Sequence, residues 1–114
     1  MAKEQNKHWE KQLEIYDKIV DLCPRFERKG KNMIYTSANG HMFTLLNKDG
    51  EIGARFSKEV QEQYLKKFNT TLYKSYGAIM QGYVLIPETM LTNLKQVAKL
   101  FDESYDYVMS LESK

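Results

Sequence analysis

The chain of 114 residues has one cysteine, Cys23, only two prolines, and no apolar run long enough to form a membrane-spanning helix. A single thiol cannot form an internal disulfide, and no second cysteine is present to make a metal pair or a redox motif with it. Residues 1–8 are polar, which argues against a signal peptide. We therefore expect a reduced, cytoplasmic protein with no membrane partner, in which Cys23 is a small buried side chain.

An excess of charge of either sign is also missing. The 17 basic and 15 acidic side chains give a formal charge of +2 and are spread along the sequence, so they supply no strong field toward nucleic acid. We interpret the densest basic segment as a solvated loop and keep a nucleic-acid-binding patch as the alternative. The basic residues of this segment are Arg25, Arg28, Lys29 and Lys31.

The sequence also lacks catalytic motifs and the residue spacings typical of metal ligands. The two histidines, His8 and His41, lie in different predicted elements, and neither they nor Cys23 belong to a recognisable catalytic arrangement. Glycine-rich phosphate-binding loops are missing too. We therefore predict no catalytic residue, no metal and no cofactor, and a protein that is not an enzyme.

What the sequence does contain is a pair of turn signals, Asn39-Gly40 and Asp49-Gly50, which separate short strand-like pieces between residues 31 and 56. Their spacing predicts a three-stranded antiparallel meander with two-residue turns. That register pairs Ile34 with Leu45, and Leu45 with Ala54. The expected core face is Ile34, Phe43, Leu45, Ile52, Ala54 and Phe56. The expected reverse face is Met33, Tyr35, Met42, Thr44, Leu46 and Arg55, with Gly53 as a gap.

Around the meander, apolar positions recur at helical spacing and predict three amphipathic helices. They span residues 9–23, 57–69 and 87–108, the last as one long helix or two abutting ones. One further strand, bent at Gly82, is expected before the last helix. The predicted element order is α-β-β-β-α-β-α, and we expect one α+β domain over residues 1–114 with an antiparallel sheet packed against helices.

The motifs Gly40-His41-Met42-Phe43 and Asp49-Gly50, together with Arg55, the Tyr76-Gly77 region and the tail at 102–108, resemble the TfoX N-terminal-domain family. The resemblance implies an α+β domain of the secretion-chaperone-like group, whose domains often form dimers. The family's founding members are bacterial regulators of natural competence. Because the glycine-rich first strand of those regulators is absent here, we expect a short, stand-alone relative without their C-terminal domain. The resemblance implies no catalytic residues.

The reverse face of the meander leads to our main functional hypothesis, because it has too few polar side chains for a sheet face that is exposed only to water. We predict a non-enzymatic binding or regulatory module, possessing a homodimer or protein-partner interface on that face. The interface residues are Met33, Tyr35, Met42, Leu46 and Arg55.

Two alternatives remain open at the level of the sequence. In the first, the sheet is covered on both faces by its own chain, and no interface is needed. In the second, the protein binds a small molecule, or is a weak enzyme, with a pocket between the sheet and the C-terminal helix. The polar groups of that pocket would be Tyr35, His41 and Arg55.

Overall fold

The computed structural model describes the backbone of residues 2–30, 34–75 and 77–112, and side chains from His8 onward. Five antiparallel strands form one sheet in the order β1-β2-β3-β5-β4. The elements are α1 (Ala2–Asp21), β1 (Ile34–Ala38), β2 (His41–Leu46), β3 (Ile52–Arg55), α2 (Lys58–Lys67), β4 (Leu72–Ser75), β5 (Ala78–Leu85), the 3-10 helix η1 (Glu88–Thr92) and α3 (Leu94–Met109).

The predicted α+β class and element order are confirmed, with one addition. The segment expected to hold a single strand folds into two, β4 and β5, which pair as a hairpin. The turn between them includes Gly77, whose φ of +78° lies in the left-handed region that glycine adopts without strain. The expected bend at Gly82 is present, because that residue also has a positive φ of +93° inside β5.

The helices begin and end where short-range signals place them. Ser57 Oγ accepts a hydrogen bond from the Val60 amide at the start of α2, as an N-cap should. Pro87 precedes η1, which abuts α3, so the C-terminal segment is the pair of helices allowed for by the sequence. No helix in the described parts of the chain combines the length and apolarity needed to cross a membrane.

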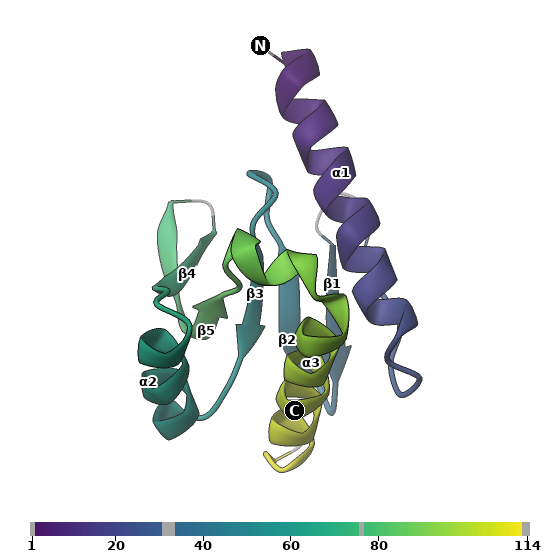
Figure 1. Ribbon diagram of the computed structural model, residues 1–114. Coiled ribbons are helices and arrows are strands. Elements are labelled where there is room, and N and C mark those ends of the chain that lie inside the picture. Colours follow the sequence, from purple (N-terminus) through teal and green to yellow (C-terminus); the bar gives the residue numbers. More distant parts are fainter. Residues whose placement is uncertain (1, 31–33, 76, 113–114) are drawn as a thin grey trace.

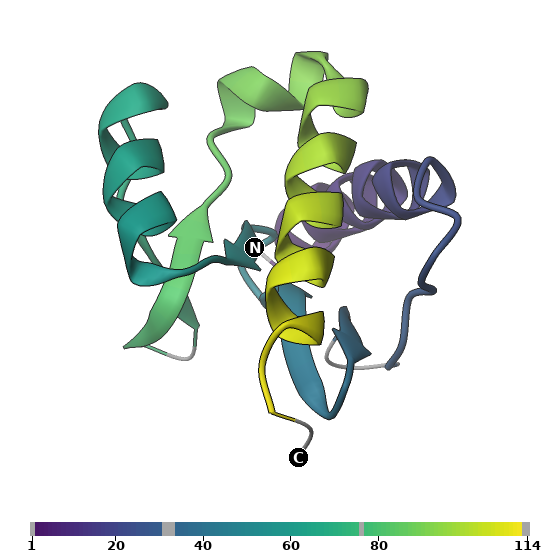
Figure 2. The ribbon, with the colours of Figure 1, turned by 90° about the horizontal axis from the view of Figure 1, so that it is seen from below.

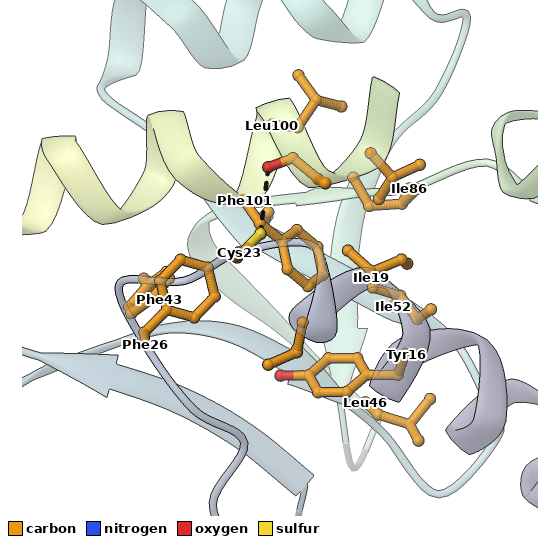
Figure 3. Close-up of a cluster of buried hydrophobic side chains, with 14 of the residues drawn as sticks. Tyr16, Ile19, Cys23, Phe26, Phe43, Leu46, Ile52, Ile86, Leu100 and Phe101 are labelled. Atoms are coloured by element: carbon orange, nitrogen blue, oxygen red, sulfur yellow. Dashed lines mark hydrogen bonds between the residues drawn. The ribbon is translucent and has the colours of Figure 1, made fainter. Parts of the chain in front are cut away.

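The three helices lie on one side of the sheet, with α3 between α1 and α2 (Figures 1 and 2). Between helices and sheet lies the main core, which takes side chains from all three helices and from β1, β2, β3 and β5. Figure 3 shows its centre, where Tyr16 and Ile19 of α1 meet Phe101 of α3 above Leu46 and Ile52 of the sheet. Within residues 2–30, 34–75 and 77–112, no helix lies on the opposite side of the sheet.

The first turn of the meander is as predicted, but the strands that it joins are not in the predicted register throughout. Asn39 and Gly40 both have positive φ, 55° and 79°, which is the two-residue type I′ turn. Farther along, Thr36 pairs with Thr44 and not with Phe43. Phe43 is therefore an extra residue in β2, and β2 contains a β-bulge.

The bulge reverses three of the predicted side-chain positions, because one extra residue changes which face each later side chain occupies. Leu46 was predicted on the reverse face, but it is 1% exposed in the main core beneath the helices. Leu45, predicted in the core, lies on the helix-free side. Thr44 was also predicted on the reverse face, but its hydroxyl faces the helices, 2.6 Å from the Tyr16 hydroxyl.

The second turn has three residues, 48–50, where two were predicted. Asn47 Oδ1 accepts hydrogen bonds from the amides of Asp49 and Glu51, and the Asn47 amide donates to Glu51 O over 3.0 Å. This side-chain-to-backbone closure favours the longer loop, with Gly50 at a φ of +81°. Leu45 consequently pairs with Gly53 and not with Ala54, which corrects the predicted register of β2 and β3 by one residue.

Ser104 of α3 lies where β2 and β3 separate. Its hydroxyl is buried and lies 3.1 Å from Phe43 O and 2.5 Å from Arg55 O, so its single proton is shared between two strand carbonyls. We expect Ser104→Ala to lower the free energy of unfolding by about 1–3 kcal/mol, because buried carbonyls lose their donor. Urea denaturation measures this, and Ser110→Ala is the matched control, since the Ser110 hydroxyl is exposed and donates to Tyr107 O in its own helix. Equal losses in the two variants would contradict this role.

Candidate functional site

The helix-free side of the sheet has an apolar cluster of its own. Leu45, Tyr73 and Tyr83 are buried there, with exposures of 1%, 0% and 6%. Four partly exposed side chains pack against these three: Tyr35, Met42, Met80 and Leu85. We call these seven residues the helix-free face.

The hairpin of β4 and β5 covers part of this face, because Tyr73 packs over the strand that contains Gly53. A Cβ atom at Gly53 would come within 2.5 Å of the Tyr73 ring, so only glycine leaves room for it. The Tyr73 hydroxyl donates to Glu51 O over 2.8 Å, and the Tyr83 hydroxyl donates to Met42 O over 2.7 Å. The chain therefore buries the centre of the face itself and leaves its four flanking side chains partly exposed.

The two tyrosines act as hydrogen-bond donors that stay protonated. Burial raises the pKa of the Tyr83 hydroxyl to about 12, and it raises the pKa of the Tyr73 hydroxyl further, because a phenolate would be poorly solvated there. Each proton is already committed to a backbone carbonyl. These residues hold the sheet together and are not placed to transfer protons.

The predicted interface residues have mixed outcomes. Tyr35 and Met42 belong to the helix-free face. Leu46 instead lies in the main core, because the bulge at Phe43 turns its side chain to the helix side of the sheet. Arg55 pairs with Tyr83 across β3 and β5, and its guanidinium carbon lies 5.8 Å from the centre of the Tyr107 ring. Met33 lies outside the described residues. The sequence did not indicate that Tyr73 and Tyr83 form the centre of this face. The one hint was Gly53, which was predicted to leave a gap in the reverse face, and the Tyr73 ring occupies that space.

Two cations of the basic segment, Arg25 and Arg28, are paired with carboxylates of the same chain. Arg25 forms ion pairs with two carboxylates of α3, Asp106 at 2.8 Å and Asp102 at 3.2 Å. Its guanidinium also lies over the ring of Tyr105 in the same helix, α3. Arg28 binds Asp17 of α1 at 2.8 Å. The backbone of Lys29 bridges to β1, and Lys31 lies outside the described residues. Two of the four predicted cations are thus neutralised inside the chain, which leaves little for a phosphate backbone to contact.

The residues considered for catalysis lie apart. His41 Nε2 is 2.8 Å from Glu112 O near the end of α3, whereas His8 is on α1. The Cys23 thiol is 3% exposed, lies 3.6 Å from Ala98 O (Figure 3), and has its pKa raised to about 12 by burial. Within the described residues, no group of three His, Cys, Asp or Glu side chains could hold a metal ion.

The predicted pocket between the sheet and the C-terminal helix would need Tyr35, His41 and Arg55 to converge. Tyr35 instead lies on the side of the sheet opposite α3, and none of the three lines a cleft that the structure describes. A cleft that the structure does describe lies elsewhere, between α1, the turn from β2 to β3, and the segment that enters η1. Its volume is about 390 Å³.

Comparison with known proteins adds no assignment: no protein-family model, no curated protein and no solved structure matches this chain. The resemblance to the TfoX N-terminal-domain family therefore stays a prediction from the residues named above.

Proposed function

We propose that this protein is a non-enzymatic binding module that forms a homodimer through its helix-free face. The observation that carries the proposal is that four apolar side chains remain partly exposed around the buried centre of the helix-free face: Tyr35, Met42, Met80 and Leu85. Contiguous exposed apolar patches on a protein surface often mark sites of interaction with another molecule.

The chemistry of the face favours a second copy of the chain as the occupant. In a two-fold dimer the same patch meets itself, so a charged patch would oppose its own charge, whereas an uncharged apolar patch is complementary to itself. None of the four partly exposed residues is charged. Arg55 of β3 pairs with Tyr83, and its guanidinium carbon lies 5.8 Å from the centre of the Tyr107 ring of α3.

The family resemblance supports a regulatory role of the same kind. If the chain is a stand-alone relative of the TfoX N-terminal domain, it would act in the bacterial cytoplasm by binding a protein partner, in a process related to competence or transcription. The internal pairing of Arg25 and Arg28 supports protein binding over direct contact with nucleic acid.

Sedimentation equilibrium tests the dimer. We expect a dimer at micromolar chain concentration, and we expect Met42→Lys to make the chain monomeric, because a charge would be buried in the interface. Met109→Lys is the matched control: Met109 is 48% exposed near the end of α3, away from the face, and this variant should remain dimeric.

Circular dichroism of both variants checks that they are folded. A wild-type chain that is strictly monomeric would refute the dimer. A dimer that survives Met42→Lys would refute the assignment to this face. A monomer that captures a different protein through Met42 would replace the second copy with another partner.

A further inference from the structure

Two of the four partly exposed side chains on the helix-free face are methionines. Met42 belongs to β2 and Met80 to β5, and β3 lies between those two strands in the sheet (Figure 1). Both side chains pack against the buried centre of the face. The backbone of Met42 is held there as well, because its carbonyl accepts the hydrogen bond from the Tyr83 hydroxyl. The face therefore presents a thioether sulfur from each of two strands.

The other methionines in the described part of the chain differ from this pair in burial or in position. Met90 of η1 is 8% exposed in the main core, whereas Met109 is 48% exposed near the end of α3. Met42 and Met80 are intermediate, so solvent reaches them in the single chain. A small dissolved oxidant can therefore react with Met42, Met80 and Met109, while Met90 is shielded.

A methionine side chain is apolar only until its sulfur is oxidised. A peroxide transfers one oxygen atom to the thioether: an S–O bond forms, the O–O bond breaks, and the sulfur loses two electrons. Hydrogen peroxide is thereby reduced to water, and the reaction requires no catalytic residue or cofactor. The product, methionine sulfoxide, is polar and accepts hydrogen bonds. Tyr35 and Leu85 carry no sulfur, so the two methionines are the part of the exposed surface that this reaction changes.

Sulfoxides on this face would oppose the burial of the face in a dimer. A buried polar group costs free energy unless it finds a hydrogen-bond partner. Among the four partly exposed side chains, only Tyr35 carries a donor. Each chain would thus bring two sulfoxide acceptors and one phenol donor to an interface in which the same patch meets itself. At least half of the sulfoxide oxygens would find no donor among these side chains.

We propose that Met42 and Met80 are modification sites that make the dimer sensitive to peroxide. The inference rests on the dimer proposed above. In the dimer both sulfur atoms are shielded, so peroxide reacts with the single chain and draws the equilibrium away from the dimer by mass action. A methionine sulfoxide reductase reverses the step: a dithiol supplies two electrons and becomes a disulfide, the thioether is restored, and the oxygen leaves as water.

Sedimentation equilibrium before and after treatment with hydrogen peroxide tests the proposal on the wild-type chain. We expect a dimer before treatment and a dissociation constant raised at least about tenfold afterwards, because unpaired polar groups must be buried. Peptide mass mapping should locate sulfoxide at Met42 and Met80, and circular dichroism should show that the oxidised chain remains folded.

Substitution by leucine separates oxidation of the face from oxidation elsewhere. The double variant Met42→Leu/Met80→Leu keeps apolar side chains of similar volume, so it should remain dimeric after treatment. Met109→Leu is the matched control, because it removes an exposed methionine away from the face and should dissociate as the wild type does. Met33 and Cys23 are unchanged in every variant, so their oxidation cannot cause a difference between variants.

The rate of oxidation gives a second readout. Met42 and Met80 should oxidise more slowly as chain concentration rises, whereas Met109 should oxidise at a constant rate. A sulfoxide reductase with dithiothreitol should restore the dimer, and failure to do so would show irreversible damage and overturn the switch.

The outcomes distinguish this proposal from the dimer itself. A dimer that persists with Met42 and Met80 both oxidised would overturn the switch and leave the dimer in place. Equal dissociation of the double leucine variant, or oxidation rates of Met42 and Met80 that do not depend on chain concentration, would also overturn it. A wild-type chain that is monomeric before treatment would refute the dimer, and the switch with it.

Discussion

Gly53→Ala is expected to lower the free energy of unfolding by about 3 kcal/mol, the upper part of the range for overpacking a buried site. The added methyl group would lie 2.5 Å from Cγ of Tyr73, a side chain that is fully buried and tied by its hydroxyl to Glu51 O. The ring cannot move aside without breaking that bond. Urea denaturation of the two proteins measures the difference.

A size-swap isolates the steric cause. In a Tyr73→Ala background both the ring and its Cγ are gone, so the added cost of Gly53→Ala should fall to less than half. Gly77→Ala is the matched control: Gly77 has a positive φ of +78° and nothing within 4 Å of the Cβ position, so it should cost only the backbone strain of about 1 kcal/mol in both backgrounds. If Gly53→Ala costs the same with and without the Tyr73 ring, close packing is not the reason for the glycine.

Asn47→Ala is expected to have the second large effect, again about 3 kcal/mol, because three partly buried backbone groups lose their partners at once. Asn47 is 4% exposed; its Oδ1 closes the turn by accepting from Asp49 and Glu51, and its Nδ2 donates to Lys74 O in β4 over 2.8 Å. One side chain thus joins the β2–β3 turn to the far strand of the sheet.

Asn47→Asp separates the two roles, since it keeps the Oδ1 acceptor and loses the donor to Lys74 O. We expect it to preserve the turn but to loosen β4, seen as faster hydrogen exchange in β4 with the β2–β3 amides still protected. Fluorescence of Trp9, the only tryptophan, reports whether α1 separates from the turn, because its indole bonds Asn47 O. Full stability in Asn47→Ala, or equal exchange behaviour in the two variants, would contradict this account.

Local signals in the sequence were sufficient for most of the elements. Asn39-Gly40 has few alternatives to a type I′ turn, because both positions need positive φ, and Ser57 and Pro87 mark helix starts by their own chemistry. The predicted length of the second turn was wrong, and the reason is also local. The side chain of Asn47 competes for the amides of the loop and adds one residue to it.

The candidate sites depended much more on contacts between distant residues. Tyr35 and Met42 could be placed on one face by alternation alone, but Leu46 could not, because the bulge at Phe43 reverses the alternation beyond it. That bulge puts the Thr44 hydroxyl beside those of Thr36 and Tyr16, from another strand and from α1. The cleft is still less visible in the sequence, since its walls come from segments near residues 10, 50 and 87.

The sequence by itself determined the α+β class, the helices with their start signals, the meander with its first turn, and the absence of an internal disulfide. Those features follow from the periodicity of apolar residues and from turn and cap residues, which act over a few positions along the chain. Only the tertiary structure decided the register of the meander, the covering of the sheet by Tyr73 and Tyr83, and the cleft beside α1. These depend on hydrogen bonds and packing between residues far apart in sequence, and a shift of one residue in a strand is enough to reverse the face that each side chain occupies.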